Sequence, residues 1–219
     1  MSTQRLRWLL GILLAAGLAA ASCRAARRRT SRDQWQQPDR VVADLGLKDG
    51  STIADIGAGR GYFTFRLGKA VGPKGKVYAT EISTRAIRSV ADRVEREKLT
   101  NIETVVSEPT DTKLTSACLD AAVICNVLHH VPKDKRLPLT KDIARALKPG
   151  GYLFIVDWRF DAKISYDKGR RIPRKDLVQL AADAGLTLDA EFLYLEHQVY
   201  LRCRKPKPPR KAPAGPASP

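Results

Sequence analysis

Ile53-Ala-Asp-Ile-Gly-Ala-Gly-Arg-Gly-Tyr-Phe63 is the segment from which the interpretation of this chain starts. Its apolar residues predict the end of a buried strand, and three glycines within five positions predict a tight turn after that strand. Glycine allows positive φ and lets a ligand lie against bare backbone. The helix expected from Tyr62 would offer free N–H groups and the positive end of its dipole to an anionic group. This pattern predicts a nucleotide-like cofactor at the carboxyl edge of a parallel sheet.

Three further segments fit the same interpretation. Lys76-Val-Tyr-Ala-Thr-Glu81 predicts a strand that ends in an acid about 20 residues after the glycine turn, the interval expected for a ribose-binding carboxylate. Leu119–Val131 contains an apolar run typical of a strand buried on both faces, followed by Asn126 and a His pair. Ala146–Asp157 contains a Lys-Pro-Gly-Gly turn before another apolar run. For Glu81, a solvated residue at the end of a strand is the alternative.

With these segments in this order, residues 35–204 resemble the class I S-adenosylmethionine-dependent methyltransferases of the small-molecule type. The first motif of that family is written much like Asp55-Ile-Gly-Ala-Gly-Arg-Gly61, and its members carry an Asn-x-x-His-His stretch after the fourth strand. The resemblance implies an α/β fold with a Rossmann-like, doubly wound and mostly parallel seven-stranded sheet that has an antiparallel C-terminal hairpin strand. A NAD-dependent oxidoreductase is the alternative enzyme, although dinucleotide folds usually space their glycines G-x-G-x-x-G. A noncatalytic, membrane-associated scaffold that binds S-adenosylmethionine is the alternative outside enzymes.

Hydrophobic periodicity predicts five alternations of strand and helix, which is typical of a parallel sheet with helices on both faces. The strands are expected at residues 52–56, 76–81, 102–106, 121–126 and 152–157. The helices are expected at residues 38–45, 62–71, 84–98, 134–147 and 174–184. A terminal hairpin is expected from two β-rich runs at residues 187–195 and 198–204.

The resemblance implies S-adenosylmethionine as the cofactor and assigns residues to it. Asp55 is expected to orient the glycine turn and to meet the cofactor's ammonium directly or through water, and Glu81 is expected to bind the ribose. Glu108 and Asp111 compete for the adenine amine, with a slight preference for Asp111. The complete set of expected cofactor-binding residues is Asp55, Gly57, Ala58, Gly59, Gly61, Tyr62, Glu81, Ile82, Glu108, Asp111 and Asn126.

Methyl transfer from a sulfonium is an in-line displacement, so it needs a general base only where the acceptor must lose a proton early. His129 or His130 is the catalytic candidate, because imidazole titrates near working pH. The alternative is that one ring packs on the following helix while the other shapes the pocket. Trp35 is expected to close over the site and Asp157 to line the substrate pocket, although Trp35 has packing on the sheet edge as its alternative. No metal site is expected, because the cysteines lack C-x-x-C spacing and a nearby His cluster suited to zinc.

The net charge of +16 is concentrated at the two ends of the chain. Residues 1–35 contain seven Arg and one Asp, and residues 202–219 contain six Lys or Arg and no acid, which leaves +4 for the residues between. This distribution favours flexible basic ends near acidic surfaces over a nucleic-acid groove on the fold. The expected partner is therefore a small-molecule acceptor and not nucleic acid, and a nucleic-acid binder with basic tails is a third alternative.

The N-terminal residues 1–23 have the layout of a secretory signal, with two Arg, an apolar run from Trp8 to Ala21, and then Ser22-Cys23. Ala20-Ala-Ser-Cys23 also resembles a bacterial lipobox. We therefore expect membrane association in a bacterial cell envelope, through a lipoprotein or signal anchor, with the side of the membrane undecided. Residues 24–34 are expected to be a basic linker, and residues 205–219 a disordered tail rich in Pro and Lys.

Overall fold

The structure is a computed structural model that describes residues 32–163 and 168–208. The predicted signal-like segment at residues 1–23, the linker up to residue 31 and the tail from residue 209 lie outside the described residues. The chain divides into two compact units, residues 1–41 and residues 42–219. In the first unit, residues 32–36 are helical, and α2 (Pro38–Asp44) begins there and ends in the second unit. The domain boundaries proposed from the sequence stay predictions.

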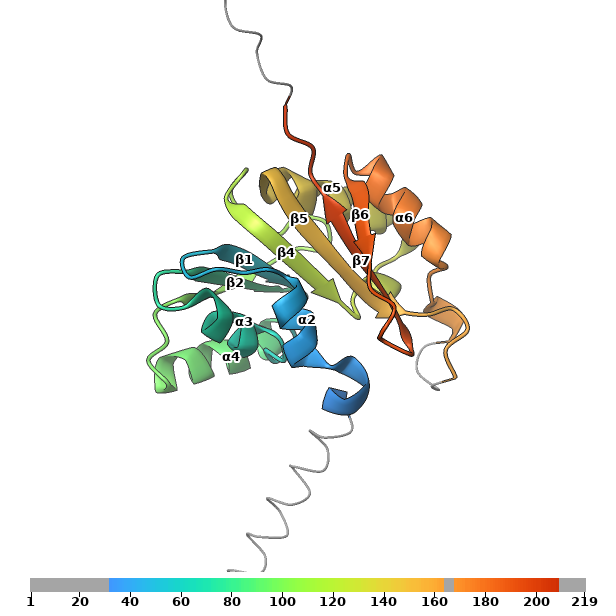
Figure 1. The fold of residues 1–219 in the computed structure, drawn as a ribbon. Coiled ribbons are helices and arrows are strands. Elements are labelled where there is room, and N and C mark those ends of the chain that lie inside the picture. Colours follow the sequence, from blue (N-terminus) through green and yellow to red (C-terminus); the bar gives the residue numbers. More distant parts are fainter. Residues whose placement is uncertain (1–31, 164–167, 209–219) are drawn as a thin grey trace, which may run out of the picture. The chain divides into compact units, whose positions relative to one another are not determined.

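Within the described residues of the second unit, seven strands form one sheet in the order β3-β2-β1-β4-β5-β7-β6 (Figure 1). The first five strands are parallel, β7 is antiparallel to β5, and β6 is antiparallel to β7. The expected mostly parallel sheet with an antiparallel C-terminal hairpin is confirmed. The strands are β1 (Thr52–Ile56), β2 (Lys76–Glu81), β3 (Ile102–Val106), β4 (Leu119–Cys125), β5 (Leu147–Trp158), β6 (Thr187–Glu191) and β7 (Gln198–Arg204).

Helices cover both faces of the sheet, with α3 and α4 on one face and α5 and α6 on the other (Figure 1). The chain crosses to β2 after β1 and to β5 after β4, so the strand order reverses between β1 and β4. In such sheets the reversal point is where ligands bind, outside the carboxyl ends of the strands. The helices are α3 (Thr64–Val71), α4 (Thr84–Arg96), α5 (Lys133–Ala146) and α6 (Arg174–Asp183), with short 3₁₀ turns η1 (Leu128–His130) and η2 (Lys168–Arg170).

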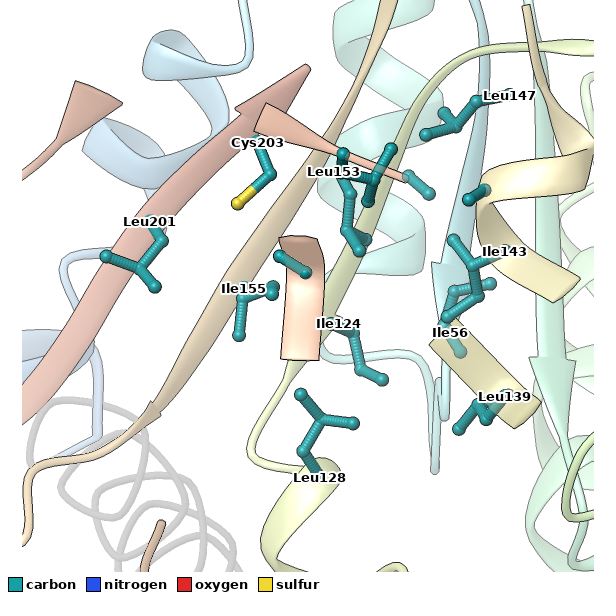
Figure 2. Close-up of a cluster of buried hydrophobic side chains, with 14 of the residues drawn as sticks. Ile56, Ile124, Leu128, Leu139, Ile143, Leu147, Leu153, Ile155, Leu201 and Cys203 are labelled. Carbon is teal, nitrogen blue, oxygen red and sulfur yellow. The ribbon is translucent and has the colours of Figure 1, made fainter. Parts of the chain in front are cut away.

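The core between the sheet and helices α5 and α6 is formed by alternate residues of the central strands. Figure 2 shows Ile124, Ile155 and Leu201 from neighbouring strands pointing toward the same cluster, with Ile143 of α5 packed against it. The intervening residues of these strands are buried as well, which explains why β1, β4 and β5 read as nearly continuous apolar runs. This packing holds the carboxyl ends of the central strands in fixed positions.

Several element boundaries differ from the predicted ones, and two of the differences have local reasons. Helix α3 begins at Thr64 and not at Tyr62, because Gly61 has a φ of +83° and the turn continues through Phe63. Strand β5 begins at Leu147 and includes the Lys-Pro-Gly-Gly segment, since the pairing with β4 shifts register there. The segment expected to end the preceding helix is thus a bulge in the strand.

The C-terminal hairpin also differs from its expected length. Strand β6 ends at Glu191, so residues 192–197 connect it to β7. In this connection Phe192 stacks on Tyr200 with ring centroids 4.4 Å apart. Among the described residues, no helix combines the length and the apolar character needed to cross a bilayer.

Candidate functional site

The predicted site residues gather at one edge of the sheet. Ile56 pairs with Thr80 of β2 and with Ile124 of β4, and Cys125 pairs with Val156 of β5. The residues that follow these positions therefore emerge at the same carboxyl edge. They include the glycine turn after β1, Glu81, the Asn126–His130 segment and Asp157.

The glycine turn has a backbone that other residues would not adopt without strain. Gly57, Gly59 and Gly61 have φ values of +70°, +56° and +83°. A Cβ atom at Gly57 would lie 2.5 Å from Val127 Cγ2, and one at Gly61 would lie 2.5 Å from Phe65 Cε2. Two of the three glycines are thus required both by φ and by close packing.

Gly59 differs from its two neighbours because its Cα faces open space. A Cβ atom built there would meet nothing within 4 Å. Its N–H donates to Glu81 Oε2 over 2.9 Å, and Ala58, whose side chain is buried, donates its N–H to Thr80 O over 2.9 Å. A bare, open backbone position beside a carboxylate fits the close approach of a nucleotide-like cofactor.

Glu81 links the glycine turn to the start of α4. Its Oε2 accepts from Gly59 N and its Oε1 accepts from Ser83 N over 2.9 Å. An ionised carboxylate has about four acceptor positions, so two such bonds leave capacity for the hydroxyls of a ribose. Ile82, the next residue, is an exposed apolar side chain with 59% of its surface accessible.

Asp55 lies beneath the turn and not on the surface. Its side chain is 3% exposed, and its Oδ2 accepts from Thr64 Oγ1 over 2.6 Å. This bond joins β1 to the first residue of α3 across the glycine turn, and the orienting role expected of Asp55 stays a prediction. Tyr62 is half-buried, and the Arg66 guanidinium lies 4.7 Å from the centre of its ring.

The two acids expected near adenine share one lysine. Lys113 Nζ lies 2.7 Å from Glu108 Oε1 and 2.8 Å from Asp111 Oδ2, and Lys113 N donates to Asp111 Oδ1 over 2.7 Å. The hydrogen bond from the Lys113 side chain lowers the pKa of Asp111, and the carboxylate of Asp111 raises the pKa of Lys113. The Asp111 carboxylate is therefore held in its ionised, accepting form near neutral pH, beside a second carboxylate on the same ammonium.

Asn126 follows β4 in the left-handed region, with a φ of +57°. Its N–H donates to Val156 O over 2.8 Å, and its Oδ1 accepts from Gln198 Nε2 over 2.6 Å. Gln198 is the first residue of β7 and is 3% exposed. The side-chain amide of Asn126 is therefore bound by a residue of β7, more than seventy positions away in the sequence.

His129 and Asp157 form a buried pair. His129 Nδ1 lies 2.6 Å from Asp157 Oδ1, His129 N donates to Asp157 Oδ2 over 3.2 Å, and Trp158 N donates to Asp157 Oδ1 over 2.8 Å. The side chains of His129 and Asp157 are only 1% and 2% exposed. Because an ionised carboxylate can only accept, the pairing with Asp157 places the proton of a neutral His129 ring on Nδ1.

His130 lies in a different environment from His129. It is exposed, and its Nδ1 lies 3.5 Å from Arg170 Nη1 of η2. The two imidazole centres are 3.9 Å apart at an angle of 45°. The structure thus places the two candidates side by side, one buried on a carboxylate and one facing solvent.

Trp35 belongs to the helical residues 32–36 of the first unit and is half-buried. Its predicted role over the site stays a prediction, as do the ligand contacts of the other candidate residues. Asp157, expected to line the substrate pocket, lies at the same sheet edge and is engaged by His129 and by backbone N–H groups.

Three polar partners at this edge were not anticipated from the sequence. They are Thr64, Lys113 and Gln198. Gln198 had a detectable signal, since it is a polar residue at the start of an otherwise apolar run, Gln198-Val-Tyr-Leu. Thr64 and Lys113 had none, because hydroxyls and lysines in such positions are ordinary in surface segments.

Comparison with known proteins finds similarity to methyltransferases. A family model described as "Methyltransferase domain" matches residues 53–151. The demethylmenaquinone methyltransferase of Lactococcus lactis subsp. lactis (strain IL1403) is 28% identical over 125 residues, covering 57% of this chain and 48% of the relative. The tRNA N(3)-methylcytidine methyltransferase trm141 of Schizosaccharomyces pombe (strain 972 / ATCC 24843) is 33% identical over 114 residues, covering 49% and 44%. The matches therefore span about half the length of these relatives.

Among solved structures, a SAM-dependent methyltransferase from Aquifex aeolicus is similar over most of the chain. It has a TM-score of 0.74 and 25% identity, and the match covers 80% of this chain and 93% of that one. The matched family region ends at residue 151, before Asp157 and Gln198. The structural match thus covers a larger share of the chain than the family match.

Proposed function

We propose that this chain transfers a methyl group from S-adenosylmethionine to a small-molecule acceptor, because it has the fold of the class I S-adenosylmethionine-dependent methyltransferases and its residues 53–151 match a methyltransferase-domain model. The observation that carries this proposal is the hydrogen bond from Gly59 N to Glu81 Oε2. It joins an open glycine turn to a strand-end carboxylate at the reversal point of the sheet, where such folds bind their ligands.

The residues present fit the cofactor in three respects. Gly59 leaves its backbone open, Glu81 keeps acceptor capacity for ribose hydroxyls, and the Glu108–Asp111 turn after β3 presents an ionised acceptor at Asp111. When bound, S-adenosylmethionine supplies a methyl group on a sulfonium, which an acceptor displaces in line. The protein's contribution is then to hold the acceptor close and aligned, at roughly 3–3.5 Å from the methyl carbon.

His129 is the better candidate for a general base. Asp157 fixes the proton on Nδ1, so Nε2 is the position that takes a proton from an acceptor that must lose one. His130 is exposed beside Arg170 and is proposed to meet the acceptor and not to accept its proton.

The small-molecule class is supported by the distribution of charge and by a relative. The region between the basic ends has a net charge of +4, and the Lactococcus lactis relative is named for demethylmenaquinone, a small molecule. The Schizosaccharomyces pombe relative is named for a nucleoside of tRNA, so tRNA is the second acceptor class to be tested.

Calorimetric titration of the protein with S-adenosylhomocysteine, and separately with NAD, tests the cofactor. We expect micromolar binding of S-adenosylhomocysteine, lost in Glu81→Ala and Asp55→Ala. Glu103→Ala is the matched control, since Glu103 is on the neighbouring strand β3 and pairs with Lys76. Binding of NAD alone would contradict the proposal. Binding of S-adenosylhomocysteine without transfer to any acceptor would favour the noncatalytic scaffold.

We further propose that residues 1–23 attach the protein to a membrane of the cell envelope. The support is the sequence pattern of two Arg, an apolar run and Ser22-Cys23. Cell fractionation of the full chain and of a Cys23→Ala variant tests it. Recovery of the full chain in the soluble fraction would contradict membrane attachment, and an unchanged membrane fraction for Cys23→Ala would exclude lipidation of that cysteine.

A further inference from the structure

We propose that Gln198 is a positioning residue for the cofactor site, acting through Asn126; the proposal rests on the proposed function. Gln198 lies on β7, beyond the matched family region, and no assignment from the sequence includes it. Its side chain is 3% exposed, and its backbone pairs with Trp158 at the carboxyl end of β5. From there it reaches past β5 to the residue that follows β4.

The contact between the two amides is short and defines their orientation. Gln198 Nε2 donates to Asn126 Oδ1 over 2.6 Å. A primary amide carries its oxygen and its NH₂ group on opposite sides of the carbonyl carbon. When the oxygen of Asn126 accepts from Gln198, its NH₂ group must therefore point away from Gln198.

Asn126 is in turn connected to the glycine turn. Its φ of +57° places it in a conformation that few residues other than Gly and Asn adopt. The next residue, Val127, packs so closely on Gly57 that a Cβ there would lie 2.5 Å from Val127 Cγ2. A rotation of Asn126 or of its backbone would therefore be transmitted to the turn that we propose holds the cofactor.

The alternative is that the two amides only satisfy each other in the core. Both roles predict some loss of stability when the bond is removed, because a buried polar group without its partner is unfavourable. Only a positioning role predicts a loss of cofactor affinity that depends on Asn126. The test must therefore measure affinity and stability on the same variants.

Gln198→Met keeps the length of the side chain and removes the donor, and Gln198→Glu keeps the shape but can only accept when ionised. Gln179→Met is the matched control, because Gln179 is exposed on α6 and its amide bonds Asp183. Affinity for S-adenosylhomocysteine is measured by calorimetry and the Tm without ligand by thermal unfolding. All variants are made in the full chain.

We expect Gln198→Met to bind S-adenosylhomocysteine roughly two- to tenfold more weakly, the range set by one hydrogen bond of ordinary strength. Gln198→Glu should weaken binding at least as much, and Gln179→Met should not weaken it. In an Asn126→Ala background, Gln198→Met should have no further effect on affinity.

Unchanged affinity in a folded Gln198→Met protein would overturn the proposal. So would an equal loss of affinity in the Asn126→Ala background, since Gln198 would then not act through Asn126. If Gln198→Met does not fold, the same affinity measurements on Gln198→Glu decide the proposal. Failure of the unmodified chain to bind S-adenosylhomocysteine would instead overturn the proposed function, and this inference with it.

Discussion

At the scale of single residues, the positions of the glycine turn require glycine for two different reasons, positive φ and close packing. Gly57 and Gly59 both have positive φ, yet only Gly57 is closely packed, against Val127. A left-handed conformation costs an L-residue with a side chain about 1–2 kcal/mol. A Cβ at 2.5 Å from a branched side chain adds a steric cost, because Val127 would have to move.

We therefore predict that Gly59→Ala lowers the free energy of unfolding by about 1 kcal/mol and that Gly57→Ala lowers it by about 1–3 kcal/mol more. Urea denaturation of both variants measures the difference. Val127→Ala in the Gly57→Ala protein should recover part of the additional loss, since it removes the clashing methyl groups. Equal losses for the two glycine variants would show that packing on Val127 is not responsible.

A second prediction at this scale concerns the proton on His129. Since Nδ1 donates to Asp157, the neutral ring should be the Nδ1–H tautomer, which ¹⁵N NMR of the ring nitrogens distinguishes. In Asp157→Asn the amide NH₂ can donate to Nδ1, so the tautomer should change to Nε2–H. His197, which lies beside Glu196 and not in this pair, is the internal control and should be unaffected. An Nε2–H ring in the unmodified protein would contradict the proposed base.

At the scale of elements, an ion pair joins α6 to the edge strand β6. Arg174 Nε lies 2.8 and 2.9 Å from the two Glu191 oxygens, and Nη2 lies 2.6 Å from Oε2. The hydrogen bonds from Arg174 lower the pKa of Glu191 below its ordinary value of 4.5. A lowered folded-state pKa gives stability that is present above the unfolded pKa and is lost as the pH falls through the folded pKa.

We predict that Arg174→Met lowers the free energy of unfolding by up to about 1 kcal/mol at pH 7, the usual limit for an exposed pair. The difference from the unmodified protein should shrink as the pH falls from about 5 toward about 3. Denaturant titrations of both proteins at neutral pH and at acid pH measure this difference in the free energy of unfolding. Arg88→Met is the control, because Arg88 is exposed on α4. A difference of the same size at both pH values would show that Arg174 stabilises through packing of its methylenes and not through Glu191.

The elements also show how far the sequence determines the result. Strands β1, β2 and β3 lie at the predicted residues, because short apolar runs bounded by turn residues have few other placements. The start of β5 was predicted too late, since a Lys-Pro-Gly-Gly segment reads as a turn although pairing with β4 keeps it in the strand. Local sequence does not contain the register shift that makes it a bulge.

In the candidate site, too, some features could be predicted from the sequence and others could not. Positions at strand ends, such as Glu81 and Asn126, were predictable because the carboxyl ends of parallel strands share one edge. The partners of Asp55 and Asn126 were not, since Thr64 and Gln198 reach the site only through the folded arrangement of α3 and β7. The pairing of His129 with Asp157 likewise depends on β4 and β5 being neighbours.

At the scale of the whole molecule, residues outside the matched family region also contribute side chains to the candidate site. The matched family region ends at residue 151, whereas Asp157 and Gln198 come from the end of β5 and from β7. The same two strands contribute Ile155 and Leu201 to the core (Figure 2). The C-terminal hairpin thus both completes the core and places side chains at the carboxyl edge.

The distribution of charge gives the last prediction. Residues 1–31 and 209–219 contain eight basic residues and no acidic one, half of the net charge of +16. Electrostatic binding to nucleic acid scales with the number of phosphates neutralised and weakens steeply with salt. We predict that the full chain binds bulk tRNA at low salt and that a chain of residues 32–208 loses most of this binding. Affinity for S-adenosylhomocysteine should be the same in both.

Filter binding across a series of salt concentrations measures the tRNA affinity, and calorimetry on the same preparations confirms that the shortened chain keeps its cofactor site. The slope of log affinity against log salt should fall in the shortened chain by roughly 0.7–0.9 for each phosphate that the protein no longer neutralises. If residues 32–208 instead retain full affinity and slope, the phosphates are bound by the folded domain. That result would favour a nucleic-acid acceptor over the proposed small-molecule class, and it would leave the cofactor assignment unchanged.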